Sequence, residues 1–172
     1  MKYFLVMLCF LTACANHQQK VKTTLYLTSE TAENKKVGTV WFKDTANGLL
    51  VEVSLKNLPQ GEHGFHIHEF PSCENMLGKD GTTQHALSAG GHYDPKKTEK
   101  HLGPNGGGHL GDLPFLTVAQ DGTVKRKFYL KNIKVEDFKN RSIMIHEGGD
   151  NYKDTPFVLG GGGKRIACGI IN

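Results

Sequence analysis

A run of alternating residue types, Gly64-Phe65-His66-Ile67-His68-Glu69-Phe70, constrains the fold of this chain more than any other segment. In a β-strand successive side chains point to opposite faces, so His66 and His68 would share one face while Phe65 and Ile67 share the other. Such a strand can place two imidazoles on one metal ion and two apolar side chains in a core. We therefore predict a strand here that serves both.

Short strand-like segments make up most of the remaining chain. Leu49 to Leu55 alternates most clearly, and Asn47-Gly48 before it is a strong hairpin-turn signal. Gly is abundant, at 21 residues, and long apolar stripes with a helical period are missing. About eight short strands in one domain predict an all-β antiparallel sandwich or flattened barrel. Besides the His66 strand, we predict strands at residues 24–29, 37–42, 49–55, 115–119, 123–130, 141–146 and 165–171.

Two long insertions interrupt the strand pattern. Residues 71–114 are polar and rich in Gly with no clear period, and residues 147–163 form a second irregular stretch. A loop as long as the first is uncommon in a compact domain unless it is tied down or functional. Because it contains Cys73 and several potential metal ligands, we expect metal ions and a disulfide to supply its order.

The N-terminus is typical of a targeting segment. Lys2 precedes an apolar run from Tyr3 to Leu11, which is shorter than the roughly 20 residues needed to span a bilayer. The run fits the hydrophobic region of a signal peptide. The tetrad Leu11-Thr12-Ala13-Cys14 resembles a bacterial lipobox, which implies cleavage before Cys14 and lipidation of its thiol. The alternative is an ordinary signal peptide that is cut nearby.

These signals divide the chain into three parts and predict its compartment. Residues 1–13 are the expected signal peptide, residues 14–21 a polar tether, and residues 22–172 the folded domain. Ala15 after the cysteine implies, by the same resemblance, attachment to the outer membrane of a bacterium, on the periplasmic side. The only membrane contact expected from the sequence is this lipid anchor at Cys14.

Cysteine usage and charge support export and argue against a nucleic-acid partner. Cys9 would leave with the leader and Cys14 would be lipidated or lost, so Cys73 and Cys168 remain as a single pair. A disulfide between them would close a loop of about 95 residues, worth roughly 4–5 kcal/mol in the chain-entropy model. The net charge of +4 is weak, and no basic cluster in the sequence is interleaved with aromatic residues.

Two overlapping sets of candidate metal ligands can be drawn from the chain. Four imidazoles, which suit the tetragonal nitrogen coordination of Cu(II), are available at His66, His68, His92 and His146. Three imidazoles and a carboxylate, which suit a closed tetrahedral Zn(II) site, are available at His92, His101, His109 and Asp112. His92 belongs to both sets, because an imidazole that has lost both protons can bridge two metals.

The residues around these ligands resemble the copper/zinc superoxide dismutases. The matching segments are Gly64–Glu69, Ala89–Pro95, His101 with His109–Asp112, Ile145–Glu147 with Asp150, and Gly162–Gly169. The resemblance extends from about Val21 to Asn172, and residues 102–114 are similar to the bacterial periplasmic branch of the family. It implies an eight-stranded Greek-key sandwich or flattened barrel, with two long loops carrying the metal site.

The resemblance also implies an activity and a role for each site residue. The family dismutates superoxide to O₂ and H₂O₂ by a one-electron copper cycle, with His92 bridging copper and zinc and carrying a proton. Arg165 would guide superoxide, Asp150 would accept hydrogen bonds from a copper-bound and a zinc-bound histidine, and Cys168 would pair with Cys73. The expected role is antioxidant defence in the cell envelope. Superoxide is the expected partner, and both a monomer and a homodimer stay open.

Two other classes of function stay open on the sequence. A periplasmic copper or zinc buffer could use the same scaffold, but it would not need Arg165 as an anion guide. A zinc-stabilised interaction domain would not need the copper set of histidines. The remaining histidines match no ligand position and are expected to be solvated loop residues: His17, His63 and His85.

Overall fold

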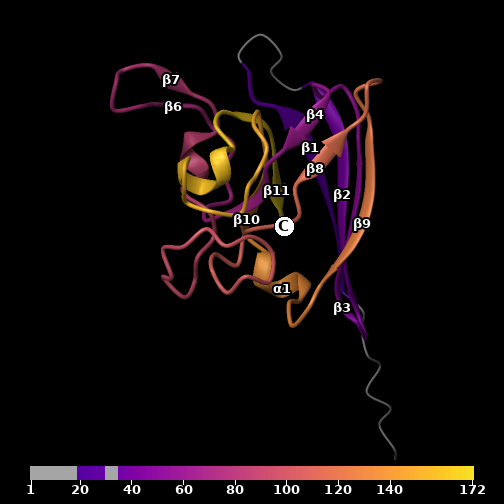
Figure 1. The fold of residues 1–172 in the computed structure, drawn as a ribbon. Coiled ribbons are helices and arrows are strands. Elements are labelled where there is room, and N and C mark those ends of the chain that lie inside the picture. The colour runs from indigo at the N-terminus through magenta and orange to yellow at the C-terminus, as the bar shows by residue number, and fades with distance from the viewer. Residues whose placement is uncertain (1–18, 30–34) are drawn as a thin grey trace, which may run out of the picture.

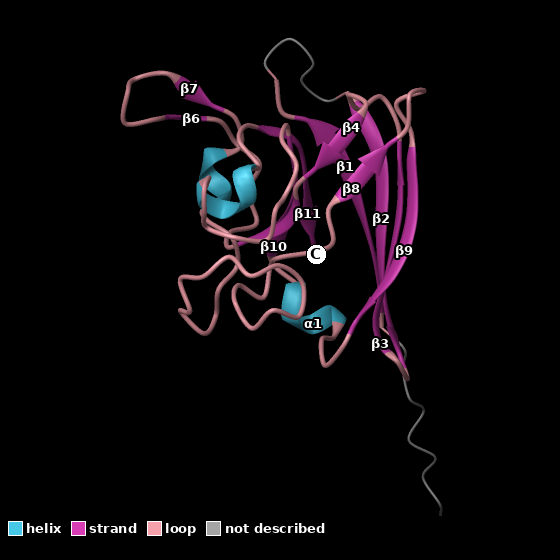
Figure 2. Cartoon of the chain, in the orientation of Figure 1, coloured by secondary structure: helices cyan, strands magenta, loops and turns pink. Residues whose placement is uncertain are grey.

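The computed structural model describes residues 19–29 and 35–172, so the predicted signal peptide and Cys14 lie outside the described residues (Figure 1). Strands dominate the described chain, and helices are short (Figure 2). The helical turns of the described residues are α1 (Val135–Phe138) and the 3₁₀ turns η2 (Leu87–Ala89) and η3 (Val158–Gly161). None of the helices in these described ranges is long and apolar enough to cross a membrane.

Seven strands form one curved antiparallel sheet in the order β5-β10-β11-β1-β2-β3-β9. The sheet curls so that β2, β3 and β9 form one wall, while β10 and β11 lie across from them (Figure 1). The strands are β1 (Lys20–Leu27), β2 (Lys36–Thr45), β3 (Gly48–Leu55), β5 (Phe65–His68), β9 (Val124–Leu130), β10 (Arg141–His146) and β11 (Arg165–Ile171).

The strand order shows long connections between hairpins. The last strand, β11, returns to pair with the first, and β9 pairs with β3 across a long stretch of chain. A separate two-stranded ribbon joins β4 (Gly61–His63) to β8 (Leu116–Val118). This non-sequential antiparallel pairing is typical of Greek-key sandwiches, and the predicted all-β fold class is confirmed.

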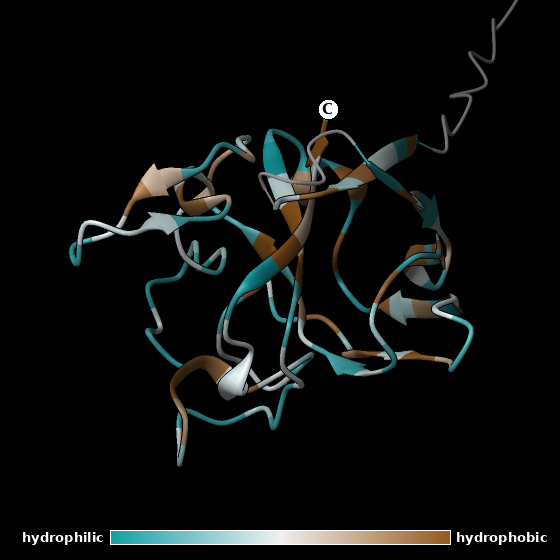
Figure 3. Cartoon of the chain, turned by 90° about the horizontal axis from the view of Figure 1, so that it is seen from above, coloured by the Kyte–Doolittle hydropathy of each residue, from teal (hydrophilic) through white to brown (hydrophobic). Residues whose placement is uncertain are grey.

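The hydrophobic core lies between the two walls of the sheet. Alternate residues of the central strands point inward and are fully buried, among them Val40, Phe42 and Val51. Hydrophobic and hydrophilic stretches alternate along the chain when the molecule is viewed from above (Figure 3). Phe65 and Ile67 are also fully buried in this core, as the alternation around His66 predicts. The core therefore provides a rigid support for the opposite side of β5.

The long loop is tied to the sheet by backbone hydrogen bonds and a disulfide. Ile67 donates its N–H to Gly111 O at 2.9 Å, and its carbonyl accepts from Tyr93 N at 2.9 Å, so the loop passes along β5. Gly111 permits this approach, because a Cβ there would collide with Ile67 O. The disulfide Cys73–Cys168 is present, with Cα atoms 5.8 Å apart. The predicted disulfide is therefore confirmed.

Several boundaries differ from the predictions. The strand β1 begins at Lys20, inside the predicted tether, because Lys20 and Val21 pair with β2. The long loop contains a small hairpin, β6 (Met76–Leu77) with β7 (Thr83–Gln84), whose turn is closed by Thr82 N–H on Asp80 Oδ1. The helix α1 was not predicted, since it has only four residues and covers the core end through Phe138 against Phe42.

Candidate metal centre and anion site

Strand β5 supplies the first two candidate ligands. His66 and His68 lie on the same side of β5, and they are 0% and 1% exposed. Backbone bridges connect them to the long loop, because His66 pairs with Asp112 and His68 pairs with His92. The loop residues that the sequence predicts as ligands are therefore held directly against this strand.

Four imidazoles converge where β5 and β10 meet the long loop. Their ligating atoms lie within 4.8 Å of one another, and all four residues are buried: His66, His68, His92 and His146. The Nε2 atoms of His68 and His146 are 3.3 Å apart. The structure thus brings together the complete set that the sequence predicts for copper.

Hydrogen bonds leave lone pairs of these rings facing one another. Three rings each donate one N–H to an acceptor at 2.7–3.2 Å: His66 to Asp150, His68 to Gly90 and His146 to Gly163. A neutral imidazole that donates through one nitrogen has a lone pair on the other. His66 Nδ1 is accordingly buried without a hydrogen-bond partner, and the Nε2 lone pairs of His68 and His146 face each other. Converging lone pairs of this kind fit a copper ion.

A second group of ligands surrounds Asp112. A cluster with all ligating atoms within 4.8 Å of one another consists of His66, His92, His101 and Asp112. Asp112 Oδ1 lies 3.0 Å from His92 Nδ1 and 3.3 Å from His109 Nδ1. The structure therefore brings all four predicted zinc ligands together, with His66 as their neighbour and His109 at the edge.

Two buried polar atoms of this second group lack hydrogen-bond partners. His101 Nδ1 and Asp112 Oδ2 are 3.0 Å apart, but their geometry is not that of a hydrogen bond. In its neutral form His101 donates its N–H from Nε2 to Asp150 Oδ1 at 2.7 Å, which leaves a lone pair on Nδ1. A nitrogen lone pair beside a carboxylate oxygen fits a Zn(II) ion, since imidazole and carboxylate are its usual ligands together with thiolate.

Asp150 connects the two groups. Its two oxygens accept hydrogen bonds from His66 Nε2 and His101 Nε2, both at 2.7 Å, and its side chain is completely buried. Gly160 makes room for this link, because its φ is +71° and a Cβ there would overlap Asp150 Oδ1. Carboxylates behind ligating histidines fix the tautomer and orientation of the rings. The position of Asp150 matches the role that the resemblance implies.

Burial keeps the four-imidazole set neutral. It lowers the pKa of His66 and His68 well below the ordinary value, lowers that of His92, and lowers the pKa of His146 to about 3. Arg165 contributes in the same direction at His68 and His146, because its positive charge disfavours an imidazolium nearby. Neutral imidazoles are the form that binds metal, so these rings are ready to ligate at neutral pH.

His101 and Asp112 shift each other's pKa in opposite directions. Burial alone would lower the pKa of His101, but the carboxylates of Asp112 and Asp150 outweigh it and raise this pKa to about 9. Burial alone would raise the pKa of Asp112, but His101 and His92 hold it far below its usual range. A cation at this position competes with the proton on His101.

Arg165 lies at the rim of the four-imidazole set. It opens β11 opposite His146, and its guanidinium donates to Ala86 O at 2.5 Å and to Gly90 O at 2.6 Å. Gly90 O also accepts from His68, so one carbonyl fixes both side chains. These contacts use two of the five N–H donors of the guanidinium, and the others can bind a small anion.

One buried histidine next to the site does not behave as the sequence predicts. The prediction that His63 is a solvated loop residue is wrong, because it is only 2% exposed. Its Nδ1 lies 2.7 Å from His146 O and its Nε2 lies 2.9 Å from Pro59 O, so it ties the backbone of His146 to a turn. The only signal in the sequence was its position just before the His66 strand. His85 is partly buried, and His17 lies outside the described residues.

Comparisons with known proteins agree with this geometry. The family model described as copper/zinc superoxide dismutase (SODC) matches residues 36–171. A copper–zinc superoxide dismutase of Brucella abortus is 49% identical over 86% of this chain and 85% of its own length. One of Escherichia coli K12 is 42% identical over 99% of this chain and 98% of its own length. A solved Brucella abortus copper/zinc superoxide dismutase has a TM-score of 0.85 and 46% identity, covering 90% of this chain and its entire own chain.

Proposed function

We propose the function of this chain from one premise: it belongs to the copper/zinc superoxide dismutase family. The chain is a superoxide dismutase, and copper and zinc are its cofactors. The finer proposal concerns the ligands, the proton path, the anion site and the location. The observation that carries it is the convergence of two ligand groups that meet at His66 and His92.

We assign copper to the four imidazoles and zinc to the group around Asp112. Copper ligands are His66, His68, His92 and His146; zinc ligands are His92, His101, His109 and Asp112. His66 is not assigned to zinc, although it lies in the cluster, because its one lone pair, on Nδ1, belongs to the copper group. His109 has no such second role, and its Nδ1 faces the carboxylate of Asp112.

Copper supplies the one-electron chemistry that dismutation requires, which zinc cannot supply. The chain provides everything else. His92 presents Nδ1 to Asp112 at 3.0 Å, so its Nε2 is the atom that can take up and return a proton beside the copper group. Asp150 holds His66 and His101 in fixed tautomers, and this preserves both groups while His92 changes its protonation.

Arg165 is assigned as the anion-binding residue. Its guanidinium is pinned by two carbonyls and carries a permanent positive charge beside His68 and His146. Superoxide is a small anion, and a fixed cation at the rim of a cleft raises its local concentration. This arrangement favours catalysis over metal buffering, because a buffer needs no anion site. The zinc-only interaction domain is not favoured, since three buried imidazoles outside the zinc group, His66, His68 and His146, converge with His92.

We propose that the enzyme acts in the periplasm and is attached to the outer membrane through lipidated Cys14. The support is the Leu11-Thr12-Ala13-Cys14 tetrad and the apolar run before it. Its role there is defence of the cell envelope against superoxide. Replacing Cys14 with Ala is expected to move the protein from membrane fractions to the soluble periplasmic fraction.

The decay rate of superoxide tests the enzymatic proposal. The chain from Ala15 to Asn172, loaded with copper and zinc, is expected to approach the diffusional limit of about 10⁸–10⁹ M⁻¹s⁻¹. Removal of copper should abolish the activity, and its return should restore it. A chain that is fully loaded with both metals but barely accelerates the decay would instead support the metal-buffer function.

A further inference from the structure

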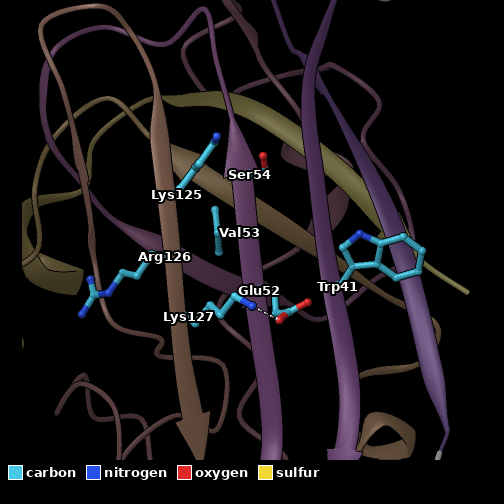
Figure 4. Close-up of a pocket in the computed structure, with 7 residues that line it drawn as sticks. All are labelled: Trp41, Glu52, Val53, Ser54, Lys125, Arg126 and Lys127. Atoms are coloured by element: carbon cyan, nitrogen blue, oxygen red, sulfur yellow. Dashed lines mark ion pairs between the residues drawn. The ribbon is translucent and has the colours of Figure 1, made fainter.

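The outward face of the β1-β2-β3-β9 sheet carries a concentration of lysines that the metal centre does not use. Across these strands the register forms rows of outward side chains. One row runs Lys20, Lys43, Leu50, Tyr129; the next runs Lys22, Trp41, Glu52, Lys127; and a third ends in Ser54 and Lys125. We call these residues the lysine face. Figure 4 shows part of it, with Trp41, Glu52, Ser54, Lys125 and Lys127 along neighbouring strands.

The charge of the lysine face is strongly one-sided. Five lysines stand against one carboxylate, that of Glu52. Glu52 is already paired with Lys127 at 2.5 Å, and this hydrogen bond lowers the pKa of Glu52 and raises that of Lys127. The face therefore keeps four positive charges, as many as the net charge of +4 of the whole chain. These lysines are scattered in the sequence, and only the strand register brings them together.

An aromatic ring lies at the centre of the lysine face. Trp41, the single tryptophan of the chain, has Lys20 Nζ 4.2 Å and Lys22 Nζ 5.2 Å from its ring centroid. Tyr129, at the edge of the face, is 51% exposed. Trp and Tyr with neighbouring lysines are the side chains that proteins place at membrane–water interfaces.

Neither the core nor the metal centre explains this composition. The inward neighbours on the same strands, such as Val40, Phe42 and Val51, fill the core completely, so the lysines point away from it. The strands that supply metal ligands are β5 and β10, at the opposite end of the sheet order. The lysine face is therefore available to contact something outside the molecule.

We propose that the lysine face docks onto an anionic phospholipid surface. Lysine charges near such a surface contribute attraction and need no specific pocket. The pocket in Figure 4, lined by Trp41, Glu52 and Lys127 among others, lies on this face. The place where the polypeptide enters the lysine face supports a phospholipid surface as its binding partner. The face begins at Lys20, six residues after Cys14, and so short a segment reaches at most about 20 Å. An anchor at Cys14, as proposed above, would keep Lys20 and the edge of the face that begins there within about 20 Å of the bilayer.

The contact is electrostatic and does not require the anchor, so it can be tested without one. The chain from Ala15 to Asn172 contains every residue of the described fold, which comprises residues 19–29 and 35–172. We would add the chain from Ala15 to Asn172 to mixed vesicles of phosphatidylglycerol and phosphatidylcholine, and to vesicles of phosphatidylcholine alone. Trp41 is an internal probe, because its fluorescence reports burial of this face alone.

The expected result is binding to the anionic vesicles with a blue shift of the Trp41 emission, and no shift with the neutral ones. Binding should weaken as NaCl rises to about 0.15 M, where the Debye length is about 8 Å. Lys43→Gln with Lys125→Gln removes two charges that have no other described partner. At about 1 kcal/mol for each lysine, this pair should weaken binding about thirty-fold.

A control pair of lysines outside the lysine face distinguishes the effect of that face on binding from the effect of the overall net charge. Lys96 and Lys97 are exposed in the long loop, and changing both to Gln alters the net charge by the same amount. This control pair should leave vesicle binding nearly unchanged. Equal losses from both pairs, equal binding to neutral vesicles, or no Trp41 shift on anionic vesicles would each overturn the proposal. A Trp41 shift with a soluble anionic polysaccharide but not with vesicles would also overturn it.

Discussion

Gly160 offers a sharp test of the link between the two metal groups. Its φ of +71° favours glycine, and an added Cβ would overlap Asp150 Oδ1 and lie 2.7 Å from His101 Nε2. Asp150 Oδ1 cannot move freely, because it accepts hydrogen bonds from His101 Nε2 and from Tyr152 N at 2.8 Å. The substitution Gly160→Ala should therefore break the hydrogen bond that orients His101.

The magnitude follows from two contributions. An alanine in the left-handed region costs roughly 1–2 kcal/mol, and loss of a charged hydrogen bond in a buried site costs about 1.5–3 kcal/mol. We expect Gly160→Ala to lower the free energy of unfolding by about 2.5–5 kcal/mol. Zinc affinity should fall about 10–100-fold, as is usual when a carboxylate behind a ligating histidine is disturbed.

Gly161 provides the matched control. Its φ is +84°, so alanine there has the same backbone cost, but the nearest atoms to its Cβ are those of Phe157 at 3.5 Å, an ordinary contact. Urea unfolding and competitive zinc titration of the two variants separate the contributions. Gly161→Ala should lose only the backbone part and keep its zinc affinity. If the two variants are indistinguishable in both measurements, Asp150 does not orient His101 as we infer.

Four further predictions concern other parts of the molecule. Replacing Arg165 with Gln should slow superoxide decay about tenfold or more while the copper content measured by atomic absorption stays at one per chain; an unchanged rate would refute the anion role. Without metals, stability should be highest near pH 6.5. As the pH falls below 6.5, His146 takes up a proton in the unfolded state but not in the folded state, where its pKa is about 3, so the free energy of unfolding decreases. As the pH rises from 6.5 to 9, His101 loses its proton in the unfolded state first, because its folded-state pKa is about 9, and its stabilising contribution is lost. A stability that rises monotonically from acid to pH 9 in urea titrations would contradict this. Reducing Cys73–Cys168, or replacing Cys168 with Ser, should lower the free energy of unfolding by about 4–5 kcal/mol. A decrease of less than about 1 kcal/mol would contradict the loop-entropy argument. Cys14→Ala should release the protein from membrane fractions, and a variant that still sediments with membranes would disprove lipidation.

The sequence predicts those features that depend on local periodicity. Alternation locates β5, β10 and β11 closely, and it places His66 and His68 on one side with Phe65 and Ile67 on the other. The ligand groups follow from residue types that suit each metal together with the family resemblance. Alternation is a property of a short segment, which carries its own pattern of residue types whatever the rest of the chain does. The ligands are spread from His66 to His146, so grouping them depends on the resemblance as well.

Features that depend on contacts between distant segments are not predictable in this way. His63 looks like any loop histidine until the fold places it under the backbone of His146, 83 residues away. The lysine face is invisible in the sequence, because Lys22, Lys43 and Lys125 become neighbours only through the register of four strands. The hairpin β6–β7 and the helix α1 are too short to produce a period.

The central claim is that two ligand groups share His92, and magnetic coupling tests it most directly. With Cu(II) in the copper group and Co(II) in place of zinc, both ions are paramagnetic, and a shared imidazole would couple their spins. We expect the electron paramagnetic resonance signal of Cu(II) to disappear when Co(II) is added and to return when Zn(II) replaces it. A Cu(II) signal that keeps its full intensity beside bound Co(II) would contradict the shared ligand and the assignment built on it.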